Sequence, residues 1–231
     1  ATEAQDTLGS LYSNGDQLDV KANATAAAFW FQKAIDNVCN TTTASSCPAS
    51  ARSKYGLGLL YVEGKLRDDG ITKAADWIEE SAKEGCGIAQ HSLGALYFSG
   101  EWIPQDYTMA VHWYQQAAAQ NISESQDSLG FMYMNGLGGL QQNYTTAAGW
   151  FRLAAIAGND EAQGYLGFLF YNGYGVPQND ALAACLFQLS AQEGYKDSQN
   201  YLAEMIQEGR AGSLKRESSG KIIEVETGDC L

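Results

Sequence analysis

The feature that most constrains this chain is a short phrase, Leu-Gly-x-x-Tyr-x-x-Gly, which recurs along its length. Its five clear copies, the last with Phe in place of Tyr, are Leu8-Gly9, Tyr12 and Gly15; Leu57-Gly58, Tyr61 and Gly64; Leu93-Gly94, Tyr97 and Gly100; Leu129-Gly130, Tyr133 and Gly136; and Leu166-Gly167, Phe170 and Gly173. A degraded sixth copy is Leu202-Ala203, Ile206 and Gly209. The last five closing glycines are 36, 36, 37 and 36 residues apart, and only the first step, of 49 residues, is longer. A fixed period in this range predicts stacked pairs of helices.

A second phrase, Ala-x-x-Trp-aromatic-x-x-Ala, follows each of the five clear copies with small variations. It reads Ala27, Trp30, Phe31 and Ala34; Ala74, Trp77, Ile78 and Ala82; Ala110, Trp113, Tyr114 and Ala117; Ala147, Trp150, Phe151 and Ala154; and Ala183, Leu186, Phe187 and Ala191. Spacings of three and four place these residues on one helical face. Seven residues before each Trp position stands an acceptable helix N-cap: Asn23, Gly70, Asp106, Asn143 and Asn179. Each repeat is therefore predicted to be two short amphipathic helices.

These phrases, with the Asp106 cap and the Gly173-x-Gly175-Val176 turn, resemble the Sel-one-like repeat family, a relative of the tetratricopeptide repeats. The resemblance covers roughly residues 3 to 209. It implies an all-α fold: a right-handed α-solenoid of about five and a half helix-turn-helix repeats that binds proteins and is not an enzyme. We expect repeats at about 3–37, 51–85, 88–121, 124–158 and 161–194, a half-repeat at 198–209, an insertion at 38–50 and an extended C-terminal tail at 210–231.

Composition excludes several classes of protein. A hydrophobic content of 45% is too high for a disordered chain. The net charge of −13 argues against nucleic acid as a partner and against docking on anionic lipid. No apolar run approaches the roughly 20 residues that span a bilayer, so no membrane insertion is expected. No cysteine and histidine spacing suggests a metal site, and we expect no cofactor.

The inner face of the array is the predicted binding surface. In tetratricopeptide-like arrays the first helix of each pair lines a concave groove, and by resemblance its inward positions are two before Leu, one after Gly and one after Tyr. This rule selects Asp6 in repeat one, Gly164 in repeat five, and a largely aromatic and aliphatic set that we predict as the partner-binding groove: Tyr55, Leu59, Val62, His91, Phe98, Asp127, Phe131, Met134, Phe168 and Tyr171.

Exposed apolar stripes of that size mark binding sites. The groove is therefore expected to hold an apolar protein segment, such as Ile222, Ile223 and Val225 of the tail of this chain or of a neighbouring copy. The alternative is that these groove residues are ordinary core.

Four Asn-x-Ser/Thr motifs predict N-linked glycans, at Asn23, Asn40, Asn121 and Asn143. Asn23 and Asn143 have a second interpretation, because both also stand at predicted helix caps. Together with the cysteines, these motifs favour an extracellular or cell-surface protein of the secretory pathway over a cytoplasmic one.

The five cysteines suggest disulfides. Cys39 and Cys47 share the polar insertion, and we expect them to pair. Cys185 and Cys230 are a second candidate pair, which would pin the tail. The alternative is five reduced thiols in a cytosolic protein.

Three functions remain open at this stage. The first is a non-enzymatic scaffold that binds another protein or assembles with itself. The second is an intracellular or compartmental adaptor that activates a partner enzyme. The third is a hydrolase with a groove site at His91, near Asp127; no motif context supplies a nucleophile, and we predict no catalytic residue.

Overall fold

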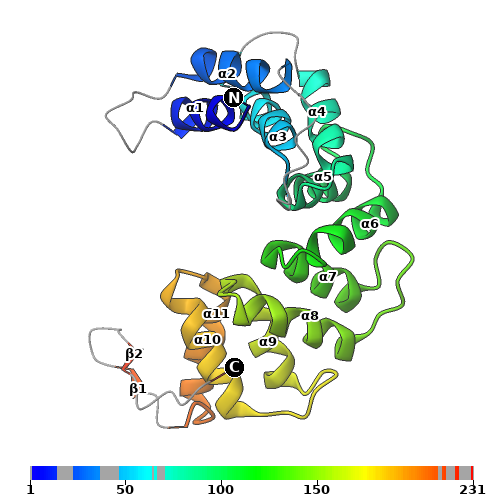
Figure 1. The fold of residues 1–231 in the computed structure, drawn as a ribbon. Helices are drawn as coiled ribbons and strands as arrows, with labels where there is room; N and C mark the ends of the chain where they lie inside the picture. The colour runs from blue at the N-terminus through cyan, green and yellow to red at the C-terminus, as the bar shows by residue number, and fades with distance from the viewer. Residues whose placement is uncertain are drawn as a thin grey trace. The chain divides into compact units, whose positions relative to one another are not determined.

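The computed structural model of the protein describes residues 2–14, 23–36, 47–63, 65–66, 71–212, 215–216, 222–223 and 230. Within them lie eleven α-helices (Figure 1): α1 Thr2–Asn14, α2 Ala24–Asp36, α3 Ala49–Val62, α4 Ile71–Lys83, α5 Gly87–Ser99, α6 Tyr107–Ala118, α7 Ser123–Asn135, α8 Tyr144–Ile156, α9 Asp160–Asn172, α10 Asp180–Gln192 and α11 Lys196–Gln207. The expected all-α solenoid of helix hairpins is confirmed. The tail contributes two short antiparallel strands, β1 Lys215–Arg216 and β2 Ile222–Ile223.

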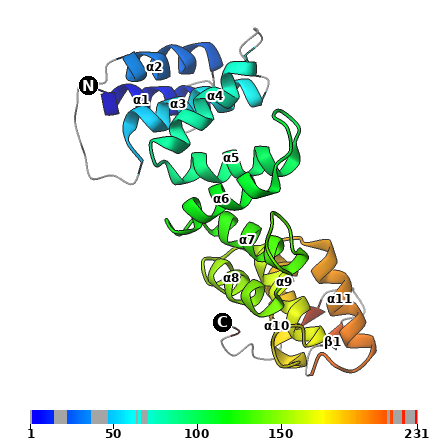
Figure 2. The same cartoon turned by 90° about the vertical axis from the view of Figure 1, so that its right-hand side faces the viewer.

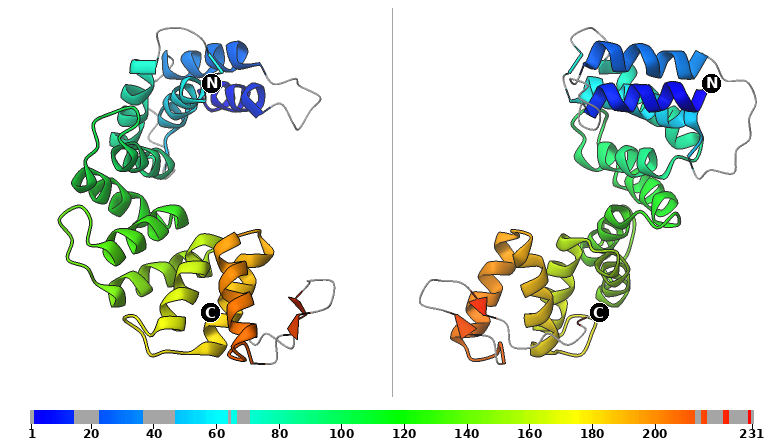
Figure 3. Two further views of the ribbon diagram at one scale, coloured as in Figure 1. Left: turned by 180° about the vertical axis from the view of Figure 1, so that it is seen from behind. Right: turned by 60° about the vertical axis from the view of Figure 1, so that its left-hand side comes forward.

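The chain divides into two compact units, residues 1–120 and 121–231. In the first unit α1 packs on α2, α3 on α4 and α5 on α6, and the hairpins stack through α2 with α3 and α4 with α5. Figure 2 shows α1 and α2 running side by side. In the second unit α7 packs on α8 and α9 on α10, and α8 stacks on α9. Helix α11 adds to α10, and Figure 3 shows these two helices adjacent, in yellow to orange.

Each hairpin closes on a contact between the glycine of the first phrase and the aromatic or aliphatic residue of the second. A Cβ added to Gly130 would lie 2.6 Å from the ring of Phe151, and the same geometry joins Gly94 to Tyr114 at 2.7 Å. The equivalent pairs in the other hairpins are Gly9 with Phe31, Gly58 with Ile78 and Gly167 with Phe187. Only glycine fits at these positions, because any side chain would separate the two helices.

The predicted caps define where the second helices begin. The side chains of Asn23, Asp106, Asn143 and Asn179 each accept a hydrogen bond from a backbone N–H of the following turn, and these predicted caps are confirmed. Gly70 lies outside the described residues.

The first helices of neighbouring repeats also meet. Helix α1 contacts α3, where the carboxylate of Asp6 accepts hydrogen bonds from Arg52 Nε at 3.0 Å and Ser53 Oγ at 2.8 Å. Asp6 was predicted on the exposed inner face, but it is buried. Its charge is matched by a cation and a hydroxyl from the next repeat, which makes burial tolerable.

The disulfides differ in part from the prediction. Cys47 is bonded to Cys86, so the expected pairing of Cys39 with Cys47 is wrong. The α3–α4 hairpin reverses the chain, which places the start of α5 beside the start of α3 and brings Cys86 to Cys47. Cys39 lies outside the described residues. The pairing of Cys185 with Cys230 is confirmed.

The predicted apolar tail segment is partly described. The backbone of Ile222 and Ile223 pairs with Arg216 and Lys215 in the β1–β2 ribbon. Val225 lies outside the described residues. In this structure the backbone of the Ile222–Ile223 pair is thus engaged by the tail itself.

Two substitutions in one hairpin isolate the glycine contact. Gly130→Ala is expected to lower the free energy of unfolding by about 1–3 kcal/mol, because its methyl group must displace the Phe151 ring. A Cβ added at Gly149 in α8 has no neighbouring atom within 4 Å. Gly149→Ala should therefore raise the free energy of unfolding by about 0.5–1 kcal/mol, because alanine has the higher helix propensity. Urea unfolding followed by circular dichroism measures both. Equal stabilities for the two variants would contradict the assigned contact.

Candidate functional site

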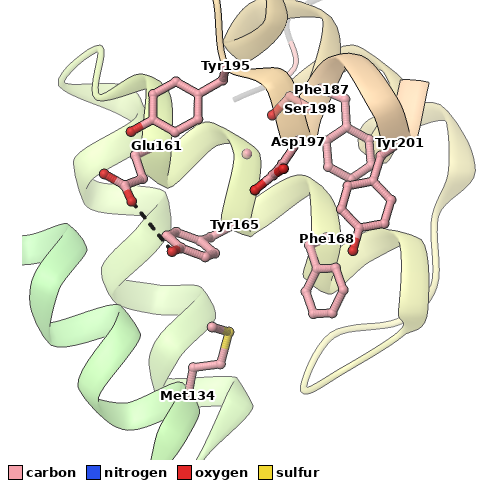
Figure 4. Close-up of a pocket in the computed structure, with 10 residues that line it drawn as sticks. Met134, Glu161, Tyr165, Phe168, Phe187, Tyr195, Asp197, Ser198 and Tyr201 are labelled. Carbon is pink, nitrogen blue, oxygen red and sulfur yellow. Dashed lines mark hydrogen bonds between the residues drawn. The ribbon is translucent and has the colours of Figure 1, made fainter. Parts of the chain in front are cut away.

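A cavity of about 280 Å³ opens in the second unit, bordered by α7, α9, α10 and α11 (Figure 4). Most of its lining is aromatic or aliphatic, and the polar part is two carboxylates and a serine. The lining residues are Met134, Glu161, Gly164, Tyr165, Phe168, Phe187, Tyr195, Asp197, Ser198 and Tyr201.

Helix α9 supplies one wall of the cavity. Glu161, Gly164, Tyr165 and Phe168 follow at spacings of three, four and seven, so they share one face of the helix. Gly164 lets α11 approach, because an added Cβ would lie 2.8 Å from Ser198 Oγ. The floor at this point is closed by the hydrogen bond that Ser198 Oγ donates to Ser190 Oγ at 2.8 Å.

The rings of the cavity are supported from behind. Tyr165 stacks on buried Phe151 with ring centroids 4.9 Å apart, and Tyr201 stacks on buried Phe187 at 5.1 Å. Phe168 packs against Tyr201 at 5.8 Å. Because the rings of Tyr165, Phe168 and Tyr201 each pack on another ring, this aromatic surface is preorganised rather than collapsed.

Glu161 links two of the tyrosines. The Tyr165 hydroxyl donates a long hydrogen bond of 3.5 Å to Glu161 Oε1, drawn in Figure 4. Burial, and then the charge of Glu161, raises the pKa of Tyr165 to about 12. Burial, followed by a hydrogen bond to Glu161, also raises the pKa of Tyr195 well above its ordinary value. Both phenols therefore stay protonated, and the negative charge at this side of the cavity belongs to Glu161.

Asp127 of α7 adds a second carboxylate near Glu161. It was predicted on the exposed groove face, but it is only 8% exposed, and its Oδ1 has no hydrogen-bond partner. Burial, and then the negative charge of Glu161, raises the pKa of Asp127 to about 7. A buried carboxylate with an orphaned oxygen is costly, and it lies where α7 contacts α9.

Two of the predicted groove residues line the cavity, Met134 and Phe168. Phe131 lies behind it and packs on Tyr165 with ring centroids 6.1 Å apart. Tyr171 is covered instead, because the Arg210 guanidinium sits 4.1 Å from its ring centroid while pairing with Asp180 at 2.7 Å.

The other predicted groove residues belong to the first unit. The Tyr55 hydroxyl is hydrogen-bonded to Ser92 Oγ at 3.1 Å, the His91 ring packs on Tyr114 at 5.6 Å, and Phe98 packs on Tyr107 at 5.4 Å. Leu59 and Val62 are half-buried in α3.

Sequence reasoning missed the tyrosines of the cavity. Tyr165 and Tyr201 both stand directly before the Leu of the first phrase. The earlier repeats carry small residues at that position: Thr7, Gly56, Ser92 and Ser128. The residue before this Leu changes from small to aromatic only in the last two repeats. That change is the sequence signal that would have identified Tyr165 and Tyr201.

The described residues set limits on other kinds of site. Within them, no three His, Cys, Asp or Glu side chains are arranged to hold a metal ion. None of the described helices has both the length and the apolar character needed to cross a membrane.

Comparison with protein-family models finds one repeat along most of the chain. The Sel1 repeat matches residues 2–38, 51–86, 87–122, 123–159, 160–195 and 196–218. A protective antigen of uropathogenic Escherichia coli strains, with an SLR fold, is 31% identical at a TM-score of 0.76; the match covers 92% of this chain and 42% of the antigen. This chain therefore spans less than half the length of that antigen.

Two further solved structures share the fold. A Sel1 repeat protein from Oxalobacter formigenes is 24% identical at a TM-score of 0.78, with 92% of this chain and 81% of that one covered. An immunity protein from Pseudomonas aeruginosa is 19% identical at a TM-score of 0.53, and the match covers 85% of this chain and 69% of that one. No curated protein matches the chain.

The buried charge of Asp127 yields a stability prediction. Its pKa of about 7 in the folded state exceeds the ordinary 3.8, so the unfolded state ionises first and stability falls as pH rises from about 4 to about 7. The shift sets an upper limit of ~4 kcal/mol, and Asp127→Asn is expected to raise the free energy of unfolding by about 2 kcal/mol at about pH 8. Near pH 4 the gain should nearly vanish.

The matched control is Asp6→Asn, at the equivalent place in repeat one. Asp6 is paired with Arg52, so its loss should lower stability at about pH 8 by about 1–3 kcal/mol. Urea unfolding of both variants at the two pH values is the measurement. A loss of stability in Asp127→Asn at about pH 8 would contradict the burial of an unpaired charge.

Proposed function

Because the chain belongs to the Sel1 repeat family, whose members are protein-interaction scaffolds, we propose that it is a non-enzymatic scaffold whose second unit binds an extended protein segment. The observation that carries the proposal is the aromatic cavity between α9 and α11. Two of its rings, those of Tyr165 and Tyr201, occupy positions where earlier repeats have small residues, so the last two repeats depart from the shared architecture at one place.

The dimensions of the cavity favour a segment over a small molecule. About 280 Å³ is at the low end of the range for small-molecule pockets, and it suits one or two side chains of a longer chain. Preorganised aromatic side chains bury apolar area on binding at little entropic cost. A partner that continues beyond the cavity adds contacts along the neighbouring helices.

The two disulfides support a secreted or cell-surface location, because such bonds persist in oxidising compartments. The side chains of Asn23, Asn121 and Asn143 are exposed, as attachment of a glycan requires. Asn40 lies outside the described residues. An intracellular adaptor that activates an enzyme is the alternative, and a reduced, unmodified chain would favour it.

The cavity gives no support to a hydrolase. Neither histidine is among its described lining residues, and His91 packs on Tyr114 in the first unit. The neutral tyrosines have pKa values raised away from the range of a general base.

Selection from a library of random peptides displayed on phage tests segment binding. We expect wild-type protein to enrich peptides with apolar residues, and Phe168→Ala to weaken that enrichment, because the substitution removes a ring from the aromatic cavity. Ile156→Ala is the control, since Ile156 is a highly exposed apolar residue of the same unit outside the cavity. Enrichment that is unchanged in Phe168→Ala, or no enrichment at all, would contradict segment binding at this cavity.

Self-assembly is tested in the same assay. A synthetic peptide of residues 210–231 is offered beside the library, because assembly through the tail requires that this segment bind another copy. Binding that is weakened in Phe168→Ala supports a neighbouring tail as the occupant.

Intact mass of the protein from its native source tests the compartment. The mass is expected to fall on treatment with peptide-N-glycosidase and to rise on reduction by two hydrogens for each disulfide. Asn121→Gln should remove one glycan, because Asn121 is exposed in the turn before α7. A single unmodified and fully reduced mass would favour the intracellular adaptor.

A further inference from the structure

The contact between the first helices of successive repeats occurs both at α1 with α3 and at α7 with α9, so the two copies can be compared. Asp6 and Asp127 both stand two residues before the Leu of the first phrase, on α1 and α7. Both are buried, and both helices contact the first helix of the next repeat. The carboxylate of Asp6 is satisfied there by Arg52 and Ser53 of α3.

The residues facing Asp127 are different. Arg52 and Ser53 stand five and four residues before Leu57, and the same positions before Leu166 hold Glu161 and Ala162. A carboxylate and a methyl group thus replace the guanidinium and the hydroxyl. Asp127 Oδ1 has no partner as a result, and Asp127 and Glu161 repel each other. The interface lacks a cation that its counterpart in repeat one contains.

The residues around Asp127 and Glu161 include further carboxylates. The cavity adds Asp197, which stands five residues before Leu202 and so repeats the position of Glu161. A second hollow beside it shares Glu161 and Tyr195 and adds Glu124 and Asp160. Among the described lining residues of both hollows there is no lysine or arginine. Residues 121–231 hold thirteen acidic and six basic side chains, so acidic residues outnumber basic ones about two to one across the unit.

Helix stability alone explains only part of this pattern. Glu161 and Asp197 lie in the first turns of α9 and α11, where acidic residues interact favourably with the helix dipole. Asp127 lies beyond the first turn of α7, buried and with an unpaired oxygen. Above about pH 7 its charge is costly unless a positive charge lies nearby.

We propose that the cavity takes a lysine or arginine side chain of the partner segment, with its stem among the rings of Tyr165, Phe168 and Tyr201. The cationic head would lie at Glu161 and Asp197 and would reduce the repulsion between Glu161 and buried Asp127. This inference rests on the proposed function and names the anchor of the bound segment. Aromatic rings with carboxylates at their margin suit such a group, because the stem is apolar and the head interacts with both.

A small probe tests the pocket without a known partner. n-Butylguanidinium chloride reproduces the end of an arginine side chain, and n-butanol has the same stem without the charge. In protein with ¹³C-labelled tyrosine rings, n-butylguanidinium at about pH 8 is expected to shift the signals of Tyr165 and Tyr201 in a saturable way, and n-butanol is not. Equal shifts with both probes would overturn the proposal.

The decisive variant is Glu161→Arg, which rebuilds the arrangement of repeat one by placing a guanidinium opposite Asp127. It should raise the melting temperature at about pH 8 and weaken binding of n-butylguanidinium by about tenfold or more. Glu161→Gln should weaken binding with a smaller gain in stability, because it removes the repulsion of Asp127 without supplying a cation. Glu193→Gln, which removes an exposed carboxylate of the same unit outside the cavity, should leave binding unchanged. Unchanged binding in Glu161→Arg would refute the site.

Peptide selection separates this inference from the proposed function. Peptides enriched by wild-type protein should carry Lys or Arg, and those residues should disappear from selections on Glu161→Arg. Enriched peptides without a basic residue would leave segment binding in place and overturn the cationic anchor. A failure to enrich any peptide, together with saturable binding of n-butylguanidinium, would refute segment binding and retain the cation site.

Discussion

The whole structure depends on the contact between a glycine of each first helix and an aromatic or aliphatic residue of each second helix. Because Gly130 has no side chain, the Phe151 ring lies directly on the backbone of α7, and the two helices close into a hairpin. The stacking of hairpins then follows from small residues such as Ala147 and Ala154 on the buried face. Positions outside these contacts are free to vary, and the candidate site uses that freedom.

The fold could be predicted because its determinants lie within single repeats, at spacings that one helix face explains. The site could not, because its determinants lie across repeats. Whether Asp127 is exposed or buried depends on how α9 packs on α7. Whether its carboxylate has a partner depends on which residue α9 places opposite it, and that residue is Glu161. The disulfide was missed for the same reason: Cys47 and Cys86 are 39 residues apart, and stacking alone brings them together. Met134 and Phe168 were found because the inner-face rule holds for them.

The comparison of Asp6 with Asp127 shows how one repeat position can serve stability in one hairpin and binding in another. With Arg52 opposite, the carboxylate joins two repeats. With Glu161 opposite, the same carboxylate is a local cost to folding, and its Oδ1 stays without a partner. A repeat protein can thus acquire a binding site by changing the residues that face an existing one, while the backbone stays the same.

The bond between Cys185 and Cys230 has a mechanical consequence. It closes a covalent ring of the chain across a separation of 45 residues, and the ring contains α11 with Tyr195, Asp197 and Tyr201. Tension applied at Cys230 would pass through the sulfur atoms directly into α10, so α11 would carry no load. Pulling on the protein at Cys230 would therefore leave Tyr195, Asp197 and Tyr201, the part of the cavity near and within α11, free of the applied force.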